Sequence, residues 1–185
     1  MLAVTEVLLL CTANVCRSVM AQAMLSARLA TSGATVLVAS AGMLGSGRRP
    51  PPEVISVMAV RGIDVSGHRS RLVTADDLMG ADLILGLARE HVRHAAVLLP
   101  TAWPRAFTLR ELLRHGHQAG ARSPCEPFVD WLARAAPHRD RRDLLGSSPA
   151  DDVADPAGGP LRGYQATAEL LDRLTRDLVE LCRLS

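Results

Sequence analysis

The chain has 185 residues, of which 48% are hydrophobic, so it is long and apolar enough to build a core of its own. Twenty-one basic residues against nineteen acidic residues leave a formal charge of +2, and the basic residues are scattered along the chain. This balance predicts neither a nucleic-acid-binding surface nor a membrane-binding surface. We therefore expect a single domain over residues 1–185.

The first residues predict no targeting segment. Met1–Glu6 holds no basic stretch, and the purely apolar run that follows, from Val7 to Leu10, is only four residues long. A signal peptide or a membrane span needs a longer run, so we expect a cytoplasmic protein. The cysteines lack the spacing of a metal site, so we expect no metal or other cofactor, and in a reducing compartment they should be free thiols. These cysteines are Cys11, Cys16, Cys125 and Cys182.

Short apolar runs alternate with helical patterns along the chain. Strands are predicted at 7–10, 35–39, 83–85 and 105–107, and helices at 18–32, 53–61, 89–97, 109–113 and 128–135. Gly33 and Gly62 are placed to end the first two helices, and Thr108 and Glu111 have the spacing of a capping box. Strands alternating with helices predict a doubly wound α/β domain, in which helices cover both faces of a parallel sheet.

The last third of the chain contains one irregular and one regular part. Residues 115–150 hold prolines 124, 127 and 137 and many arginines, and we expect an irregular segment that leads the chain to a loop around Asp155. A helix with one apolar stripe follows, and we expect it to pack against the core without taking part in chemistry. The stripe consists of Ala168, Leu171, Leu174, Leu178 and Leu181.

The stretch from Val7 to Ser18 carries the chemistry. A buried strand runs into a loop that Cys11 opens and Arg17 closes, and a helix begins near Ser18. The loop therefore lies at the carboxyl end of a strand and the amino end of a helix, where backbone N–H groups have no helical partner and attract an anion. Five residues between Cys11 and Arg17 let this loop curl around a tetrahedral oxyanion.

These positions predict a nucleophile and its anchor. The loop amides, the helix end and the guanidinium all stabilise a thiolate at Cys11, and the planar fork of Arg17 can bind two oxygens of the oxyanion. The rival interpretation is a small core cysteine, because the Cys-x5-Arg spacing alone is a weak signal. For Cys16 two roles stay open, which are packing under the loop and a redox partner that protects Cys11 from irreversible oxidation.

Four motifs, in the same order over almost the whole chain, resemble the low-molecular-weight protein tyrosine phosphatase family. They are Cys11-Thr12-Ala13-Asn14-Val15-Cys16-Arg17-Ser18, Ser40-Ala41-Gly42, His68-Arg69-Ser70-Arg71 and Val153-Ala154-Asp155-Pro156. The resemblance implies the three-layer fold of phosphotyrosine protein phosphatase I, with a central four-stranded parallel sheet. It also implies a cysteine-dependent phosphomonoesterase, in which residues 12–18 bind the phosphate and Cys11 becomes a phosphocysteine.

The resemblance implies further roles, residue by residue. Asp155 would protonate the leaving oxygen and then act as base on the water that hydrolyses the phosphocysteine. Ser18 would donate a hydrogen bond to the sulfur of Cys11. Three other matches would hold the loop in shape by hydrogen bonds: Asn14, Ser40 and His68. The remaining histidines follow no ligand spacing and are expected at the surface: His91, His94, His115, His117 and His138.

The pocket walls depart from the family pattern. Members specific for phosphotyrosine carry an aromatic residue after Ser-Ala-Gly and tyrosines after Asp-Pro, whereas this chain has Met-Leu-Gly-Ser-Gly at 43–47 and Ala-Gly-Gly at 157–159. Whether Tyr164 or Trp131 takes their place stays open. The predicted substrate is therefore either a phosphotyrosine protein, with a tyrosine kinase as the matching partner, or a small phosphate ester.

An arsenate reductase or arsenate-thiol transferase is the alternative on the same scaffold. Such an enzyme needs a thiol relay, which a small-thiol co-substrate would supply in this chain. The Asp155-Pro156 match favours the phosphatase, because arsenate reduction has no ester leaving group to protonate. A binding module without catalysis is disfavoured by the intact set of cysteine, asparagine, arginine and serine in the loop.

Overall fold

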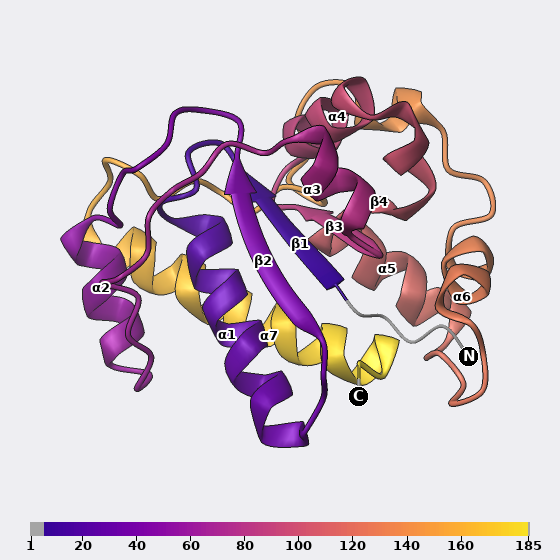
Figure 1. The fold of residues 1–185 in the computed structure, drawn as a ribbon, viewed down its shortest axis with the longest axis horizontal. Helices are drawn as coiled ribbons and strands as arrows, with labels where there is room; N and C mark the ends of the chain where they lie inside the picture. The colour runs from indigo at the N-terminus through magenta and orange to yellow at the C-terminus, as the bar shows by residue number, and fades with distance from the viewer. Residues whose placement is uncertain (1–5, 185) are drawn as a thin grey trace.

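The computed structural model describes residues 6–184, which form a four-stranded parallel sheet with helices on both faces (Figure 1). The strands are β1 (Glu6–Cys11), β2 (Leu37–Gly42), β3 (Leu83–Gly86) and β4 (Ala106–Thr108). The helices are α1 (Arg17–Ser32), α2 (Pro52–Ala59), α3 (Ala75–Gly80), α4 (Arg89–Leu98), α5 (Leu109–Ala119), α6 (Phe128–Ala135) and α7 (Leu161–Cys182), with 3-10 helices η1 (Pro100–Arg105) and η2 (Arg141–Leu144). Residues 1–5, which enter the prediction that the chain starts without a targeting segment, lie outside the described residues, as does Ser185. The predicted doubly wound α/β fold is confirmed.

The strand order β2-β1-β3-β4 places β1 inside the sheet, between the two strands that follow it in sequence. The chain first moves outward from β1 to β2 and then crosses back over β1 to β3. Such a reversal opens a crevice at the carboxyl ends of the strands, where doubly wound proteins bind their ligands. Cys11 is the last residue of β1, so the predicted anion loop begins in this crevice.

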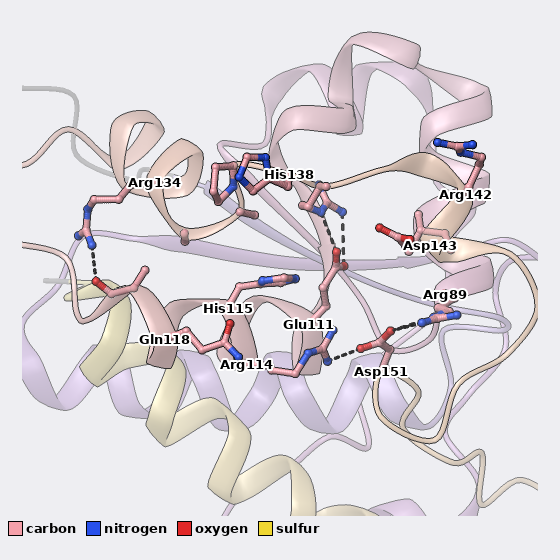
Figure 2. Close-up of a pocket in the computed structure, with 16 residues that line it drawn as sticks. Arg89, Glu111, Arg114, His115, Gln118, Arg134, His138, Arg142, Asp143 and Asp151 are labelled. Atoms are coloured by element: carbon pink, nitrogen blue, oxygen red, sulfur yellow. Dashed lines mark hydrogen bonds and ion pairs between the residues drawn. The ribbon is translucent and has the colours of Figure 1, made fainter.

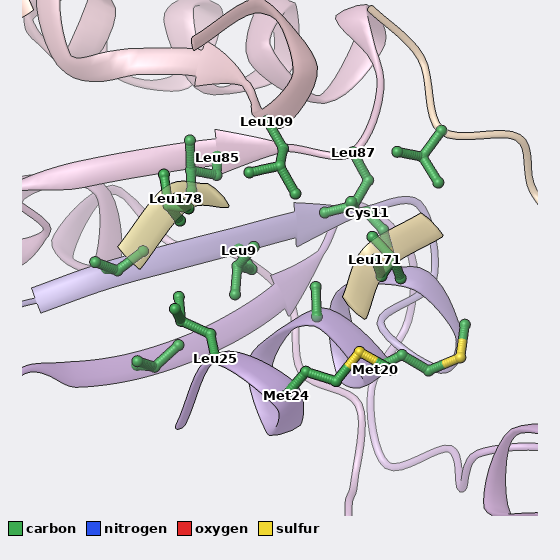
Figure 3. Close-up of a cluster of buried hydrophobic side chains, with 14 of the residues drawn as sticks. Leu9, Cys11, Met20, Met24, Leu25, Leu85, Leu87, Leu109, Leu171 and Leu178 are labelled. Carbon is green, nitrogen blue, oxygen red and sulfur yellow. The ribbon is translucent and has the colours of Figure 1, made fainter. Parts of the chain in front are cut away.

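The two faces of β1 belong to two separate apolar cores. Leu9 and Cys11 point to the face that α1 and α7 cover (Figure 3). Leu8 and Leu10 point the other way, into a smaller cluster with Leu78 of α3. The apolar run of β1 is fully buried because helices cover a parallel sheet on both faces. Cys11 therefore sits at the end of a strand that packing fixes from both sides.

Two predicted elements differ in extent from the structure, and one helix was not predicted. The second strand begins two residues later than predicted and continues through Ser-Ala-Gly, because its last residue, Gly42, pairs with Cys11 in register. Helix α5 continues to Ala119, into the segment predicted to be irregular, since Gly116 leaves room for the side chain of Leu181. Helix α3 was not predicted, although Thr74 and the residue three positions later form a complete capping box. The predicted helix at 128–135 is confirmed as α6.

Candidate active site

The loop between β1 and α1 surrounds the sulfur of Cys11. Ser18 Oγ lies 3.0 Å from Cys11 Sγ, and the backbone N–H of Asn14 donates to the same sulfur at 3.2 Å. Asn14 Nδ2 also donates to Ser18 Oγ at 2.9 Å, which leaves the hydroxyl hydrogen of Ser18 free to point at the sulfur. Two donors aimed at one buried sulfur stabilise negative charge on it.

Asn14 organises the loop from inside. Its φ of 52° lies in the left-handed region, which asparagine adopts more readily than most residues. Its buried side chain donates to Ser40 Oγ at 2.8 Å and accepts from the backbone N–H of Arg71 at 3.0 Å. His68 Nε2 lies 2.9 Å from the carbonyl oxygen of Asn14 and must carry a proton to donate to it. The structure thus brings Asn14, Ser40 and His68 together, and Ser40 in turn donates to Gln22, which was not predicted.

The anion loop also packs against the end of β2. A Cβ atom at Gly42 would lie 2.9 Å from the backbone nitrogen of Asn14, so only glycine fits there without a shift. The next two residues, Met43 and Leu44, donate their N–H groups to the carbonyl oxygen of Thr12 at 2.8 and 2.9 Å. The Ser-Ala-Gly motif therefore forms the back wall of the anion loop.

Arg17 joins the anion loop to the segment that carries Asp155. Its guanidinium, with the side chain only 6% exposed, donates to Asp155 Oδ2 at 2.6 Å and to Thr12 Oγ1 at 3.0 Å. A third hydrogen bond, 3.2 Å long, reaches the carbonyl oxygen of Val153. Residues 138 positions apart in the sequence thus meet in front of the loop.

A cavity of about 310 Å³ opens beside Arg17 and Asp155. The described residues that line it include Glu90 and Asp152 but no aromatic side chain. Neither aromatic candidate fills the gap. Tyr164 is buried and accepts a hydrogen bond from the N–H of Gly158, while buried Trp131 donates to the carbonyl oxygen of Gly120. The lining is therefore mixed: three carboxylates and two arginines, Arg17 and Arg93, lie among small apolar residues.

His91 was expected at the surface, and this prediction is wrong. Its ring is fully buried, with Nε2 3.1 Å from Thr12 Oγ1. Burial, together with the positive charges of Arg17, His94 and Arg93, lowers the pKa of His91 to about 3, so the ring is neutral. The signal in the sequence was its position in the first turn of α4, directly after the carboxyl end of β3.

Thr12 is the point where these groups meet. Its hydroxyl donates to Glu90 Oε1 at 3.1 Å and accepts from Arg17, so the ring of His91 must donate to it. This assignment leaves His91 Nδ1 without a hydrogen, and that atom has no partner among the described residues. Neither Glu90 nor His91 was predicted, and together they fix the hydroxyl that orients the guanidinium of Arg17.

Cys16 packs beneath the loop as a neutral thiol. Burial raises its pKa to about 12, and the negative charges of Asp155 and Cys11 add to the effect. This supports the packing role in the resting protein, while its oxidative pairing with Cys11 stays a prediction. Within residues 6–184 no group of three or more His, Cys, Asp or Glu is arranged to hold a metal ion. Across the same residues no helix is both long and apolar enough to span a membrane.

The geometry defines a hydrolase of the low-molecular-weight phosphatase type, with a cysteine in an anion loop and a carboxylate opposite. The family model of low molecular weight phosphotyrosine protein phosphatases matches residues 6–126, and the chain belongs to this family. The predicted family is thereby confirmed. The matched region includes the anion loop and ends before Asp155, whose role therefore rests on the geometry above and on the motif.

Individual relatives are similar over different lengths. "Probable low molecular weight protein-tyrosine-phosphatase EpsP" of Ralstonia solanacearum is 35% identical over 130 residues, which cover 70% of this chain and 88% of that protein. The protein-arginine-phosphatase of Bacillus subtilis is 25% identical over 176 residues, or 95% of both chains. The crystal structure of a low molecular weight protein tyrosine phosphatase from T. tengcongensis superposes with a TM-score of 0.72 at 30% identity, covering 95% of this chain and 98% of that one.

Proposed function

We propose that this chain dephosphorylates proteins in two steps, through a phosphocysteine at Cys11. One observation carries the proposal: the sulfur, the guanidinium of Arg17 and the carboxylate of Asp155 converge on one buried anion loop. In the first step Cys11 Sγ attacks phosphorus, so that an S–P bond forms as the bond to the leaving group breaks. The loop N–H groups and Arg17 hold the phosphoryl oxygens as charge shifts during this step.

Asp155 would handle the protons of both steps. It pairs with Arg17, and a phosphoryl group bound to Arg17 would take over this contact and leave the carboxyl free. Asp155 then gives a proton to the departing group and, in the second step, accepts one from the water that attacks the phosphocysteine. As the S–P bond breaks, the Ser18 hydroxyl stabilises the departing sulfur.

Phosphotyrosine is the first candidate substrate, as the name of the Ralstonia relative suggests. Phosphoarginine is a second candidate, and two observations favour it. Two relatives that align in sequence over 95% of this chain are protein-arginine-phosphatases, from Bacillus subtilis and Geobacillus stearothermophilus. The cavity beside Arg17 has no aromatic wall for a phenol ring among its described lining residues, and its carboxylates, Glu90 among them, can pair with a guanidinium leaving group.

The mechanism is tested by p-nitrophenol release from p-nitrophenyl phosphate without added metal. We expect turnover in the wild type, a loss of about 10³-fold or more in Cys11→Ser, and a loss of about 10²-fold or more in Asp155→Asn. Asp130→Asn on α6, remote from the loop, is the matched control and should keep full activity. An inactive wild type under reducing conditions would overturn the proposal, and arsenate with a thiol donor would then be the next substrate to test.

The substrate is tested with two peptides of the same flanking sequence, one carrying phosphotyrosine and the other phosphoarginine. If the carboxylate of Glu90 selects a guanidinium leaving group, Glu90→Gln should lower kcat/KM for phosphoarginine about tenfold and leave kcat/KM for phosphotyrosine within about twofold. Glu53→Gln, on α2, is the control. Equal effects of Glu90→Gln on both peptides would contradict a selective role of Glu90.

A further inference from the structure

A second and larger cavity, of about 750 Å³, lies along α5 (Figure 2). The end of α6, the segment 135–144 and Asp151 form its other walls. Among the described residues, it shares no lining residue with the cavity at Arg17, yet the two are neighbours along the chain. Ala88 and Asp152 line the cavity at Arg17, and their chain neighbours Arg89 and Asp151 line the larger cavity.

The lining of the larger cavity is rich in positive charge. Five arginines and two histidines face three carboxylates, while the apolar lining consists of three alanines, Pro137 and Leu144. The arginines are Arg89, Arg114, Arg134, Arg139 and Arg142. No phenylalanine, tyrosine or tryptophan is among the described lining residues. Guanidinium groups bind oxyanions side by side, so the lining suits a compact anion of several charges.

Two of these arginines are committed to the structure. Arg139 pairs with Glu111 at 2.7 Å, and its guanidinium stacks 4.0 Å from the ring of Trp103 and 3.8 Å from that of Phe107. Arg134 donates two nitrogens to Glu126 at 2.9 Å and the third to a backbone carbonyl. These side chains cannot turn toward a ligand without breaking those contacts.

Two other arginines remain accessible and lie apart across the cavity (Figure 2). Arg142 is 84% exposed and pairs with Asp140. Arg114 is 43% exposed and places one nitrogen on the carboxylate of Asp151. The Arg142–Asp140 pair is exposed and contributes little stability, so a ligand with more negative charge can replace that carboxylate at small cost. Asp151 is buried, but it keeps its ion pair with Arg89 when Arg114 turns toward a ligand.

Asp151 connects this cavity to the reaction site. Its side chain is 4% exposed and binds Arg89 as well as Arg114. The next two residues are each held by a hydrogen bond. The carboxylate of Asp152 accepts from the N–H of Arg89 at 2.8 Å, and the N–H of Val153 donates to the carbonyl oxygen of Leu87. The carbonyl oxygen of Val153 accepts from Arg17, which pairs with Asp155. The hold of Asp151 on its arginines therefore sets the start of the segment that carries Asp155.

We propose that the larger cavity binds a compact polyphosphate-type anion through Arg114 and Arg142, and that this anion slows the enzyme by drawing Arg114 away from Asp151. Binding is independent of the reaction, whereas the effect on turnover rests on the proposed phosphatase function. Because coupling is reciprocal, an anion that loosens the Asp155 segment binds less tightly when a reaction-site ligand orders that segment.

Methylenediphosphonate is a suitable probe, because its P–C–P link resists hydrolysis. It should compete with p-nitrophenyl phosphate at the anion loop and, in addition, lower kcat from the larger cavity. Arg142→Gln should keep the basal kcat and weaken the effect on kcat about five- to tenfold, which corresponds to the net loss of one hydrogen bond at an exposed site. The matched control is Arg141→Gln on the same turn, since Arg141 is exposed and does not line the cavity. Purely competitive inhibition, or equal effects in the two variants, would overturn the regulatory step.

Calorimetry tests binding apart from activity. In an Arg17→Met protein the anion loop has lost its guanidinium. Methylenediphosphonate should still bind to this protein in the larger cavity, with a stoichiometry near one. Adding Arg142→Gln should weaken that binding about five- to tenfold, and adding Arg141→Gln should not. Unchanged affinity on adding Arg142→Gln would overturn the anion site even if the phosphatase proposal stands. A tight site in this protein with no effect on wild-type turnover would overturn only the regulation.

Discussion

The anion loop at 11–18 and the segment at 151–159 face each other across the site, and they are held in opposite ways. The anion loop is buried and its hydrogen bonds come mostly from its own residues and from the end of β2. The Asp155 segment has no regular structure, and the Asp155 side chain is 42% exposed. Arginines from α1, α4 and α5 hold that segment from outside.

The difference fits the two tasks that we propose. The anion loop must hold the same phosphoryl oxygens in both steps, so a rigid arrangement of donors serves it best. The carboxyl of Asp155 must release Arg17, give a proton and then accept one, and the product must pass it on leaving. The half-exposed carboxyl of Asp155, held by one ion pair, can make such adjustments more easily than the buried side chains that are hydrogen-bonded to one another in the anion loop.

The largest expected effect comes from the residue that both regions share. Arg17→Met removes the phosphoryl anchor and the partner of Asp155 together, so kcat/KM should fall about 10²- to 10³-fold. Hydrogen exchange should rise over 153–159 and stay low over 11–16, because the main-chain bonds of the anion loop do not depend on Arg17. Arg28→Met, on the same helix and paired with Asp172, is the control for helix stability. Equal loosening of both regions in Arg17→Met would break the comparison.

How far the sequence predicts this site follows from the same contrast. The anion loop is predicted well, since eight consecutive residues and a strand-to-helix junction set its shape. Asp155 was predicted from its motif alone, and in the structure an ion pair joins it to Arg17. The capping box at Thr108 is equally local and was predicted, whereas the capping box at Thr74 was missed because the helix that it starts has only six residues.

The residues that escaped prediction depend on the packing of distant elements. His91 and Glu90 reach Thr12 only because β3 lies beside β1, which apolar periodicity in α4 does not reveal. Asp151 looks like one of several acidic residues in a polar stretch, and its burial follows from where α4 and α5 place their arginines. The end of β2 was misplaced because Ser40, Ala41 and Gly42, which pair with the last three residues of β1, are small and do not form an apolar run.

His91 offers the next largest effect, on stability against pH. Its pKa is about 3 in the folded chain and about 6.5 when unfolded, so between these values only the unfolded chain binds a proton there. Stability should therefore fall as pH drops below about 6.5, by at most about 1.4 kcal/mol per pH unit from this residue. Burial also lowers the pKa values of His68 and His115, which adds slope of the same sign.

The share of His91 is measured by comparison with His91→Gln, whose amide can still donate to Thr12. Urea unfolding between pH 7 and pH 5 should show a shallower loss of stability in this variant than in the wild type. His138→Gln, at an exposed position, should keep the wild-type slope. Because the ring of His91 contacts Thr12, its protonation affects the anion loop and not the Asp155 segment. Identical slopes in the wild type and His91→Gln would show that the buried ring does not resist protonation.

Asp151→Asn should give the smallest effect and the finest test of the contrast, since it loosens the Asp155 segment without touching the anion loop. Arg89 and Arg114 lose their shared carboxylate, so the proton donor is held less well while the nucleophile and phosphoryl anchor stay in place. A phenolate of high pKa needs that proton more than p-nitrophenolate does. We expect kcat/KM to fall about tenfold for phenyl phosphate and about twofold for p-nitrophenyl phosphate.

A general loss of structure would lower kcat/KM for both substrates by the same factor, so the ratio between them isolates the position of the proton donor. Asp143→Asn, an exposed carboxylate in the same cavity without a bond to the Asp155 segment, should leave this ratio unchanged. If Asp151→Asn leaves kcat/KM for both substrates at the wild-type value, the segment is held by its own folding rather than by its arginines. The two sides of the site would then be alike in rigidity, and the proposed action of an anion at Arg114 would lose its means of reaching Asp155.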